Sequence, residues 1–309
     1  MTVTFHADDF GITLDQSRRI LALSSRCGGD GALGGVSVLV NGPQAQACAE
    51  LLKPHADRLR VCLHVNLVEG RCCADPAKIP LLVDDAGVFR LGYGAMLAGS
   101  AGPRAAELRR QMACEIEAQI ERFLSFFPDA RGRFCVDSHQ HTHLVPVVFG
   151  ALGDALAARG CRLAYLRVPA EPLAPFLTSP ASLARIPPVN WVKHALLNAL
   201  WHHDRRAFPK LATQAEALAD VFCGINFSGR MTPLNVRGVL PAFEAYARRR
   251  GKGLELLFHP GGIDRAEDSL NPGLEGFVAF ETSPLRAEEA RSLRELEQAA
   301  LGRDGADGR

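Results

Sequence analysis

The feature that most constrains the fold of this chain is the regular alternation of short apolar runs with helical patterns along its 309 residues. The apolar runs include Val3 to Phe5, Val36 to Val40, Phe134 to Asp137 and Leu254 to Phe258. Strands that alternate with helices pair in parallel through right-handed crossovers, so the pattern predicts an α/β protein with mostly parallel strands. Because the barrel-like pattern continues throughout, we expect residues 1–301 to form a single domain.

Two segments depart from this alternation. Residues 169–209 begin with several prolines and continue with a helical pattern that carries Trp191 and Trp201, which indicates an insertion. The final residues, 302–309, are expected to form a disordered tail.

The composition argues against several kinds of partner and location. Hydrophobic residues make up 47% and charged residues 22% of the chain, and the net charge is +1, with no basic stripe that would bind nucleic acid. No apolar stretch is long enough for a membrane span, and no signal peptide pattern opens the chain. Nine scattered cysteines without a CxxC motif indicate reduced thiols. We therefore expect a cytoplasmic protein, with a homodimer as the commonest assembly of such chains.

Two adjacent carboxylates, Asp8 and Asp9, stand at the end of the first apolar run. Two like charges without a basic neighbour are costly to bury unless a cation or a reaction requires them. The alternative is one Asp that caps the next helix beside one that is solvated.

Histidines follow three later strands. They are His64, the cluster His139, His141 and His143, and His259. The ordinary alternatives are a satisfied core histidine, a polar or adventitiously metal-binding loop, and a ring packed before a Pro-Gly-Gly turn. Because the carboxyl ends of parallel strands share one face of the sheet, we expect these side chains to converge with Asp8 and Asp9.

One carboxylate and two histidines can hold a metal ion while leaving positions open for water and substrate. The second Asp is then free to act as a base, and a histidine near the ion can act as a general acid. Of the clustered histidines, one is expected to be a ligand and the others to support it or to contact substrate.

These motifs resemble those of the YdjC/ChbG carbohydrate deacetylases, relatives of the polysaccharide deacetylases. The matching strings are ADDFG (Ala7 to Gly11), LHVNLVEG (Leu63 to Gly70), DSHQHTH (Asp137 to His143) and ELLFHPG (Glu255 to Gly261). The resemblance implies an irregular (β/α) barrel of the polysaccharide-deacetylase type. It also implies Asp9, His64 and His139 as ligands of one divalent metal ion, Asp8 as general base and His259 as a catalytic histidine. LHVNLVEGR and LRVPAEP are most similar to the hopanoid-associated branch, from which His6, Ser138 and Gln140 differ.

We therefore expect a metal-dependent hydrolase that removes the acetyl group from an N-acetylated amino sugar. Zinc, magnesium, manganese, cobalt or nickel suits the expected ligands. We expect His143 and Arg167 to contact the substrate, and the insertion to form either a wall for its aglycone or a dimer interface. The alternatives are a non-haem Fe(II) oxygenase and a sugar- or metal-binding protein without catalysis; the presence of Asp8 and His259 favours hydrolysis.

Overall fold

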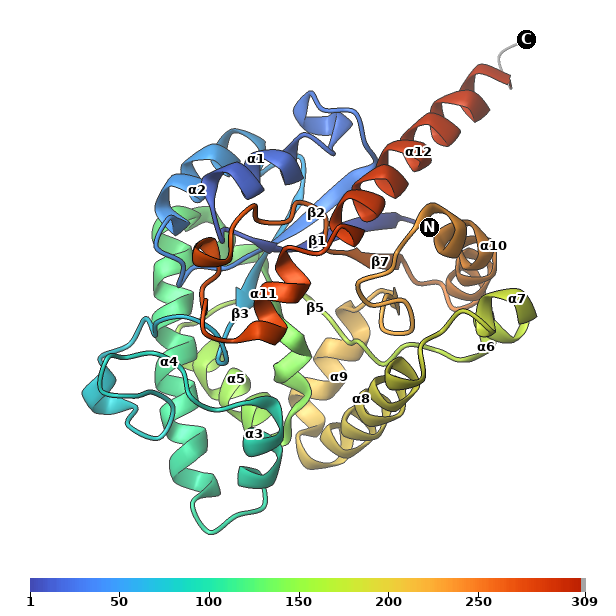
Figure 1. Ribbon diagram of the computed structural model, residues 1–309. Coiled ribbons are helices and arrows are strands. Elements are labelled where there is room, and N and C mark those ends of the chain that lie inside the picture. Colours follow the sequence, from blue (N-terminus) through green and yellow to red (C-terminus); the bar gives the residue numbers. More distant parts are fainter. Residues whose placement is uncertain (307–309) are drawn as a thin grey trace.

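The computed structural model describes residues 1–306, which form one seven-stranded sheet surrounded by helices (Figure 1). The strands are β1 (Val3–Phe10), β2 (Leu33–Val38), β3 (Arg60–Val65), β4 (Phe134–Ser138), β5 (Leu163–Leu166), β6 (Val221–Cys223) and β7 (Leu254–Phe258). Their order in the sheet is β5-β4-β3-β2-β1-β7-β6, and every pairing is parallel. The predicted α/β class is confirmed.

Helices cover the outside of the sheet (Figure 1). They are α1 (Leu14–Leu21), α2 (Ala45–Leu52), α3 (Tyr93–Gly99), α4 (Ala105–Phe126), α5 (Pro146–Ala158), α6 (Ala174–Leu177), α7 (Pro180–Leu183), α8 (Pro188–Ala207), α9 (Pro209–Leu218), α10 (Pro233–Arg249), α11 (Glu275–Glu281) and α12 (Leu285–Ala306). None of the helices in residues 1–306 combines the length and the apolar character needed to cross a bilayer.

The sheet curls into an open barrel. β5 and β7 stand far apart in the sheet order, yet Arg167, just after β5, donates from Nε to Glu255 Oε1 of β7 at 2.6 Å. The Tyr165 hydroxyl of β5 donates to the same carboxylate. Contacts of this kind across the sheet require it to curl. No pairing joins β5 to β6 in residues 1–306, so the barrel is open between these two edges.

Both faces of the strands are buried, as expected for a parallel sheet covered by helices. In β7 all five residues are buried, and the leucines belong to the hydrophobic core. Glu255 instead joins a polar network inside the barrel with residues of other strands and their ends. Hydrogen bonds and ion pairs connect it within this network to His6, Ser37, Asp137, Tyr165 and Arg167.

The insertion and the described part of the C-terminal segment contain helices. The predicted insertion at 169–209 contains α6, α7 and α8, which confirms the helix expected around Trp191 and Trp201. At the other end, residues 302–306 continue α12 where the sequence predicts a tail. The rest of that predicted tail, 307–309, lies outside the described residues.

Candidate functional site

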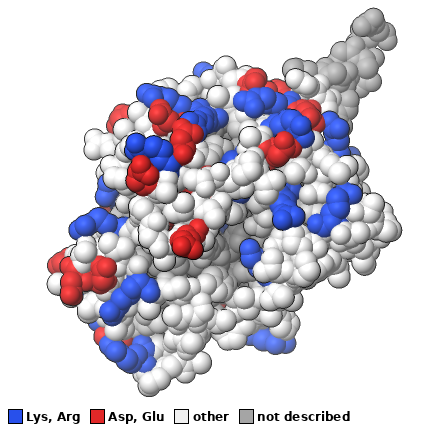
Figure 2. Space-filling model, viewed as in Figure 1, with Lys and Arg blue, Asp and Glu red and all other residues white. Residues whose placement is uncertain are grey.

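A cavity of about 880 Å³ opens at the carboxyl ends of the strands. Figure 2 shows that this face of the molecule is hollowed near its centre, while charges of both signs are scattered around it. The cavity is lined by Asp8, Asp9, His64, Tyr93, His139, Gln140, His141, Lys193, Leu196, Leu197, Ile225, Ser228, His259, Gly273, Leu274, Glu275, Gly276, Phe277 and Phe280. Strand ends, α3, α8 and the α11 region all contribute, so distant segments converge as expected from the parallel topology.

The backbone at Asp9 explains how two consecutive carboxylates reach one cavity. Successive side chains of a regular strand point to opposite faces, but Asp9 has φ 64°, in the left-handed region. Gln16 Nε2 of α1 donates to the Asp9 carbonyl oxygen at 2.7 Å and anchors this conformation. A non-glycine residue in that region costs on the order of 1–3 kcal/mol, and such strain is commonest at functional sites.

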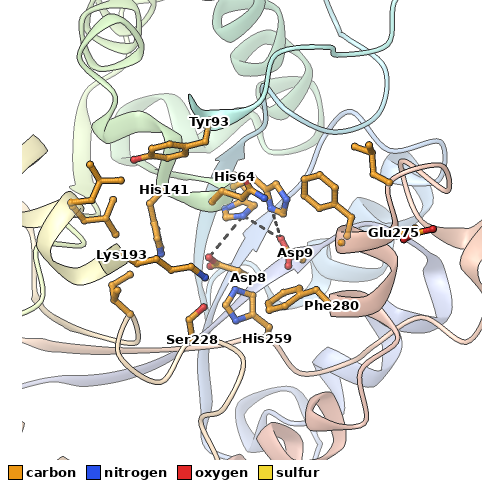
Figure 3. A pocket seen from close by; sticks show the side chains of 18 of the residues that line it. Asp8, Asp9, His64, Tyr93, His141, Lys193, Ser228, His259, Glu275 and Phe280 are labelled. Carbon is orange, nitrogen blue, oxygen red and sulfur yellow. Dashed lines mark hydrogen bonds and ion pairs between the residues drawn. The ribbon is translucent and has the colours of Figure 1, made fainter. Parts of the chain in front are cut away.

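His64 presents one ring nitrogen to the two carboxylates. Its Nδ1 is hydrogen-bonded to Asp137 Oδ1 at 2.6 Å, and its Nε2 lies 3.4 Å from Asp9 Oδ1 and 3.9 Å from Asp8 Oδ2 (Figure 3). This buried Nε2 has no hydrogen-bond partner among the described residues. Burial lowers the pKa of His64, but Asp8 and Asp137 outweigh it and raise the value to about 9. A carboxylate that orients a histidine in this way is the usual support of a metal-ligating ring.

His139 completes the group from the 3₁₀ helix His139–Leu144. Its Nδ1 lies 2.9 Å from Asp9 Oδ1, and its Nε2 lies 3.1 Å from Glu69 Oε2. Burial opposes the charged forms of both Asp9 and His139, but the attraction between them outweighs it. The pKa of Asp9 is therefore well below its ordinary value, and the pKa of His139 is well above its ordinary value.

Asp9, His64 and His139 fit a metal ion. One nitrogen or oxygen atom from each lies within 4.8 Å of the others, and the orphaned His64 Nε2 points to the same place. Carboxylate and imidazole are suitable ligands for a divalent transition metal. Two other sets of residues also bring their ligand atoms within 4.8 Å of one another: His6 with Cys62 and Asp137, and Asp8 with His64 and Asp137. Both sets contain Asp137, which Arg167 Nη2 contacts at 3.0 Å. A cation beside this guanidinium would be repelled, which favours the Asp9 group.

Asp8 is held by Arg167 beneath the cavity. The guanidinium donates from Nη1 and Nη2 to the two carboxylate oxygens at 2.8 and 3.0 Å. Burial raises the pKa of Asp8 to about 6 although Arg167 opposes the shift. The prediction that Arg167 contacts substrate is wrong, because its side chain is 0% exposed and its donors bind carboxylates inside the barrel.

His259 lies on the opposite side of the carboxylates from His64 in Figure 3 and lines the cavity. Its backbone N–H donates to Glu289 of α12, which fixes the turn after β7. Its ring meets Phe280 edge-on, and its buried Nδ1 has no partner among the described residues. Burial, assisted by Arg286, lowers the pKa of His259 to about 3, so the ring is neutral at neutral pH.

The three clustered histidines lie in different surroundings. Gln140 and His141 have φ of 53° and 56°, so the segment turns and its alternate residues do not share one face. His141 reaches the cavity. His143 does not: it is fully buried, with Nδ1 hydrogen-bonded to Ser138 Oγ at 2.6 Å and Nε2 to the Arg167 carbonyl oxygen at 2.9 Å. The prediction that His143 contacts substrate is therefore wrong.

The insertion reaches the cavity through residues other than its tryptophans. α8 presents Lys193, Leu196 and Leu197 to the cavity. Trp201 is buried and meets Phe149 edge-on, and Trp191 meets His194 of its own helix. Helical periodicity alone could not show which stripe of α8 would face the site.

Sequence reasoning also missed Glu69, Lys193 and the aromatic residues of the α11 region. Glu69 lies within the motif that contains His64, and a carboxylate in such a string was the available signal. Phe277 stacks against the His139 ring with centroids 5.8 Å apart. No local pattern connects this distant phenylalanine with the histidine cluster.

Fold and site together define an open α/β barrel with an Asp-His-His group suited to one metal ion beside a second carboxylate and a further histidine. The chain belongs to the family described as YdjC-like protein, whose sequence model matches residues 2–301. This confirms the resemblance drawn from the motifs.

Relatives of this chain include named deacetylases. A carbohydrate deacetylase of Mus musculus is 31% identical over 262 residues, covering 82% of this chain and 76% of the mouse protein. The Homo sapiens carbohydrate deacetylase is 30% identical, covering 84% and 75%. A chitooligosaccharide deacetylase of Escherichia fergusonii is 26% identical, covering 51% and 56%.

A crystal structure from Enterococcus faecalis, described as a cellobiose-phosphate cleavage protein, superposes with a TM-score of 0.64. It covers 98% of this chain and 94% of that chain at 19% identity. At this identity the likeness concerns the fold alone.

Proposed function

We propose that this protein hydrolyses the N-acetyl group of an amino sugar in an oligosaccharide or glycoconjugate, with one divalent metal ion held by Asp9, His64 and His139. The observation that carries the proposal is the convergence of these three groups, with an unpartnered buried His64 Nε2, beside Asp8 and His259 in one cavity. The deacetylase names of the relatives at 30% and 31% identity support the reaction class.

When bound, the ion would polarise the acetyl carbonyl and lower the pKa of a water molecule, which are the usual contributions of a metal to hydrolysis. The rest of the chemistry belongs to side chains. Asp8 accepts the proton of the attacking water, and a pKa of about 6 leaves it ionised at neutral pH yet basic enough for this task. Arg167 fixes both of its oxygens, so the base has a defined orientation.

His259 serves the leaving amine. Its ring is neutral in the resting site, and the negative charge that develops during attack raises its affinity for a proton. The protonated ring then delivers this proton to the amine nitrogen. The proton that Asp8 takes from the water passes to the His259 ring, directly or through solvent, and from there to the amine nitrogen as the C–N bond breaks. Asp8 and His259 therefore both return to their starting protonation states, and acetic acid and the free amine are the products.

The two alternatives are less well supported. A non-haem Fe(II) oxygenase needs two histidines and one carboxylate but no second, adjacent Asp oriented by a buried arginine. A binding protein without catalysis has no need for Asp8 and His259 at the same cavity.

The test is acetate release from N-acetylglucosamine oligomers by purified protein that has been chelated and then reloaded with one metal at a time. We expect release to stop on chelation, to return with at least one ion, and to need neither oxygen nor 2-oxoglutarate. His203→Gln changes an exposed histidine of α8 and serves as the control for metal content. Undiminished release from metal-free protein would refute the metal dependence. Absence of release from every sugar, with every ion, would refute the deacetylase.

A further inference from the structure

Lys193 is an unpaired cation in the wall of the cavity. Of the described residues that line the cavity, it alone is a lysine or arginine. Figure 3 shows its ammonium end directed into the cavity from α8. No hydrogen bond or ion pair joins its ammonium to another described residue, and burial lowers the pKa of Lys193 with no carboxylate opposing the shift.

The carboxylates of the cavity do not compensate this charge. Asp8 is bound by Arg167, and Asp9 is bound by His139. Glu275 lies on the opposite side of the cavity from Lys193 in Figure 3, and no ion pair joins the two. Lys193 is exposed at the cavity, and a lysine there without a protein partner can make a charge-assisted contact with an anionic group of a ligand.

The residues around Lys193 indicate which other groups a ligand could have. Leu196 and Leu197 follow it on α8 and form an apolar part of the wall. Ser228 and His141 project into the same side of the cavity, and the buried His141 Nδ1 has no hydrogen-bond partner among the described residues. The wall therefore offers a cation and hydrogen-bonding groups beside an apolar surface.

We propose that Lys193 determines substrate specificity by binding an anionic group, a carboxylate or a phosphate, on the part of the sugar substrate remote from the acetamido group. This inference rests on the proposed function, because the acetamido group must lie at Asp8, Asp9 and His259 for the substrate to extend along α8. Burial of an apolar aglycone against Leu196 and Leu197 accompanies the ionic contact.

The experiment measures kcat/KM for matched anionic and neutral substrates with the metal-loaded protein. One pair is phenyl and 4-carboxyphenyl N-acetylglucosaminide, and the other is N-acetylglucosamine and its 1-phosphate. A charge-assisted hydrogen bond at a partly exposed site predicts about a tenfold preference for the anion in at least one pair. A preference in the first pair indicates a carboxylate site, and a preference in the second pair indicates a phosphate site. Because the site is open to solvent, high salt should reduce the preference.

Three variants attribute the preference to Lys193. Lys193→Met should bring the anionic-to-neutral ratio to about one, and Lys193→Glu should bring it below one. Lys210→Met removes an exposed lysine from α9, outside the cavity, and should leave the ratio as it is. A ratio near one for both pairs in the unmodified protein, or a ratio unchanged in Lys193→Glu, would overturn the assignment. Equal loss of kcat for neutral and anionic substrates in Lys193→Met would also overturn it, because the lysine would then serve the reaction itself.

Failure of the proposed function gives a different result. If no substrate releases acetate, the proposed deacetylase activity is refuted. Anion binding by Lys193 is then tested by titration calorimetry with the same compounds. The dissociation constants should show the same tenfold preference for one anion and its loss in Lys193→Met. Equal dissociation constants would refute the anion site independently of turnover.

Discussion

Replacing Arg167 with methionine tests whether this buried guanidinium keeps Asp8 ionised. Asp8 loses its bidentate partner, and its next cationic neighbour is His64 Nε2, 3.9 Å away. The other two carboxylates keep close partners: Asp137 keeps His64 Nδ1 at 2.6 Å, and Glu255 keeps Arg60 Nη1 at 3.2 Å. The loss therefore falls mainly on Asp8.

Its magnitude follows from the pKa of about 6 that Asp8 has with Arg167 present. Without the guanidinium, burial should keep Asp8 protonated beyond pH 8. Between pH 6 and 8 the folded variant then holds one more proton than the folded wild type, while the unfolded chains are alike. The variant accordingly loses stability relative to the wild type by about 1.4 kcal/mol per pH unit, which gives about 3 kcal/mol at pH 8 and nearly nothing from this source below pH 6. Breaking other buried ion pairs costs about as much.

The assay is urea unfolding of metal-free protein at pH 5.5, 7 and 8, followed by tryptophan fluorescence. Arg206→Met, at an exposed arginine of α8, is the control and should follow the wild type at every pH. Adding Asp8→Asn to the Arg167 variant removes the carboxylate and should abolish the pH-dependent part of the loss. Parallel pH profiles for the wild type and Arg167→Met would refute the reasoning.

Other substitutions test the remaining assignments. His64→Ala and His139→Ala should each lose the single ion per chain, measured after chelation and reloading; unchanged ion content in either variant contradicts its role as ligand. Asp8→Asn should retain the ion but lose about 100-fold or more of its turnover, whereas Asp9→Asn should lose both; an empty site in Asp8→Asn would reverse the two roles. Burial raises the pKa of Asp204 to about 7, so the folded protein is destabilised when this carboxylate ionises. Asp204→Asn should therefore stabilise the protein by about 1–2 kcal/mol more at pH 8 than at pH 5. A larger stabilisation at pH 5 than at pH 8, measured by urea unfolding, would contradict this.

The parts of the site that sequence could predict are those where a polar residue directly follows an apolar run. Asp8, His64, His139 and His259 each stand at or near the end of a strand, and the parallel topology brings such ends to one face. The strand positions and the cavity thus follow from local pattern and a general rule of sheets.

The parts that sequence could not predict depend on how the sheet curls. Arg167 follows β5 in the chain, so an exposed strand end with a free guanidinium was a reasonable expectation. In the structure its partners come from β1, β4 and β7, and the pairing exists only because the barrel brings these strands together across its interior. The left-handed backbone of Asp9 could not be predicted for a related reason. The hydrogen bond that holds it comes from Gln16 on the following helix, and the sequence does not show this contact.

Asp137 connects Asp8, the proposed base, with His64, a candidate metal ligand, through this same interior network. Its Oδ1 binds His64 Nδ1, and its Oδ2 accepts from Ser37 Oγ and contacts Arg167. Arg167 in turn holds Asp8, so the orientations of His64 and Asp8 depend on one shared set of buried groups. Because every member is at most 3% exposed, none can exchange its partner for water at little cost. The charged interior that makes this barrel costly to assemble is therefore also what fixes the distance between Asp8 and the candidate metal ligand His64.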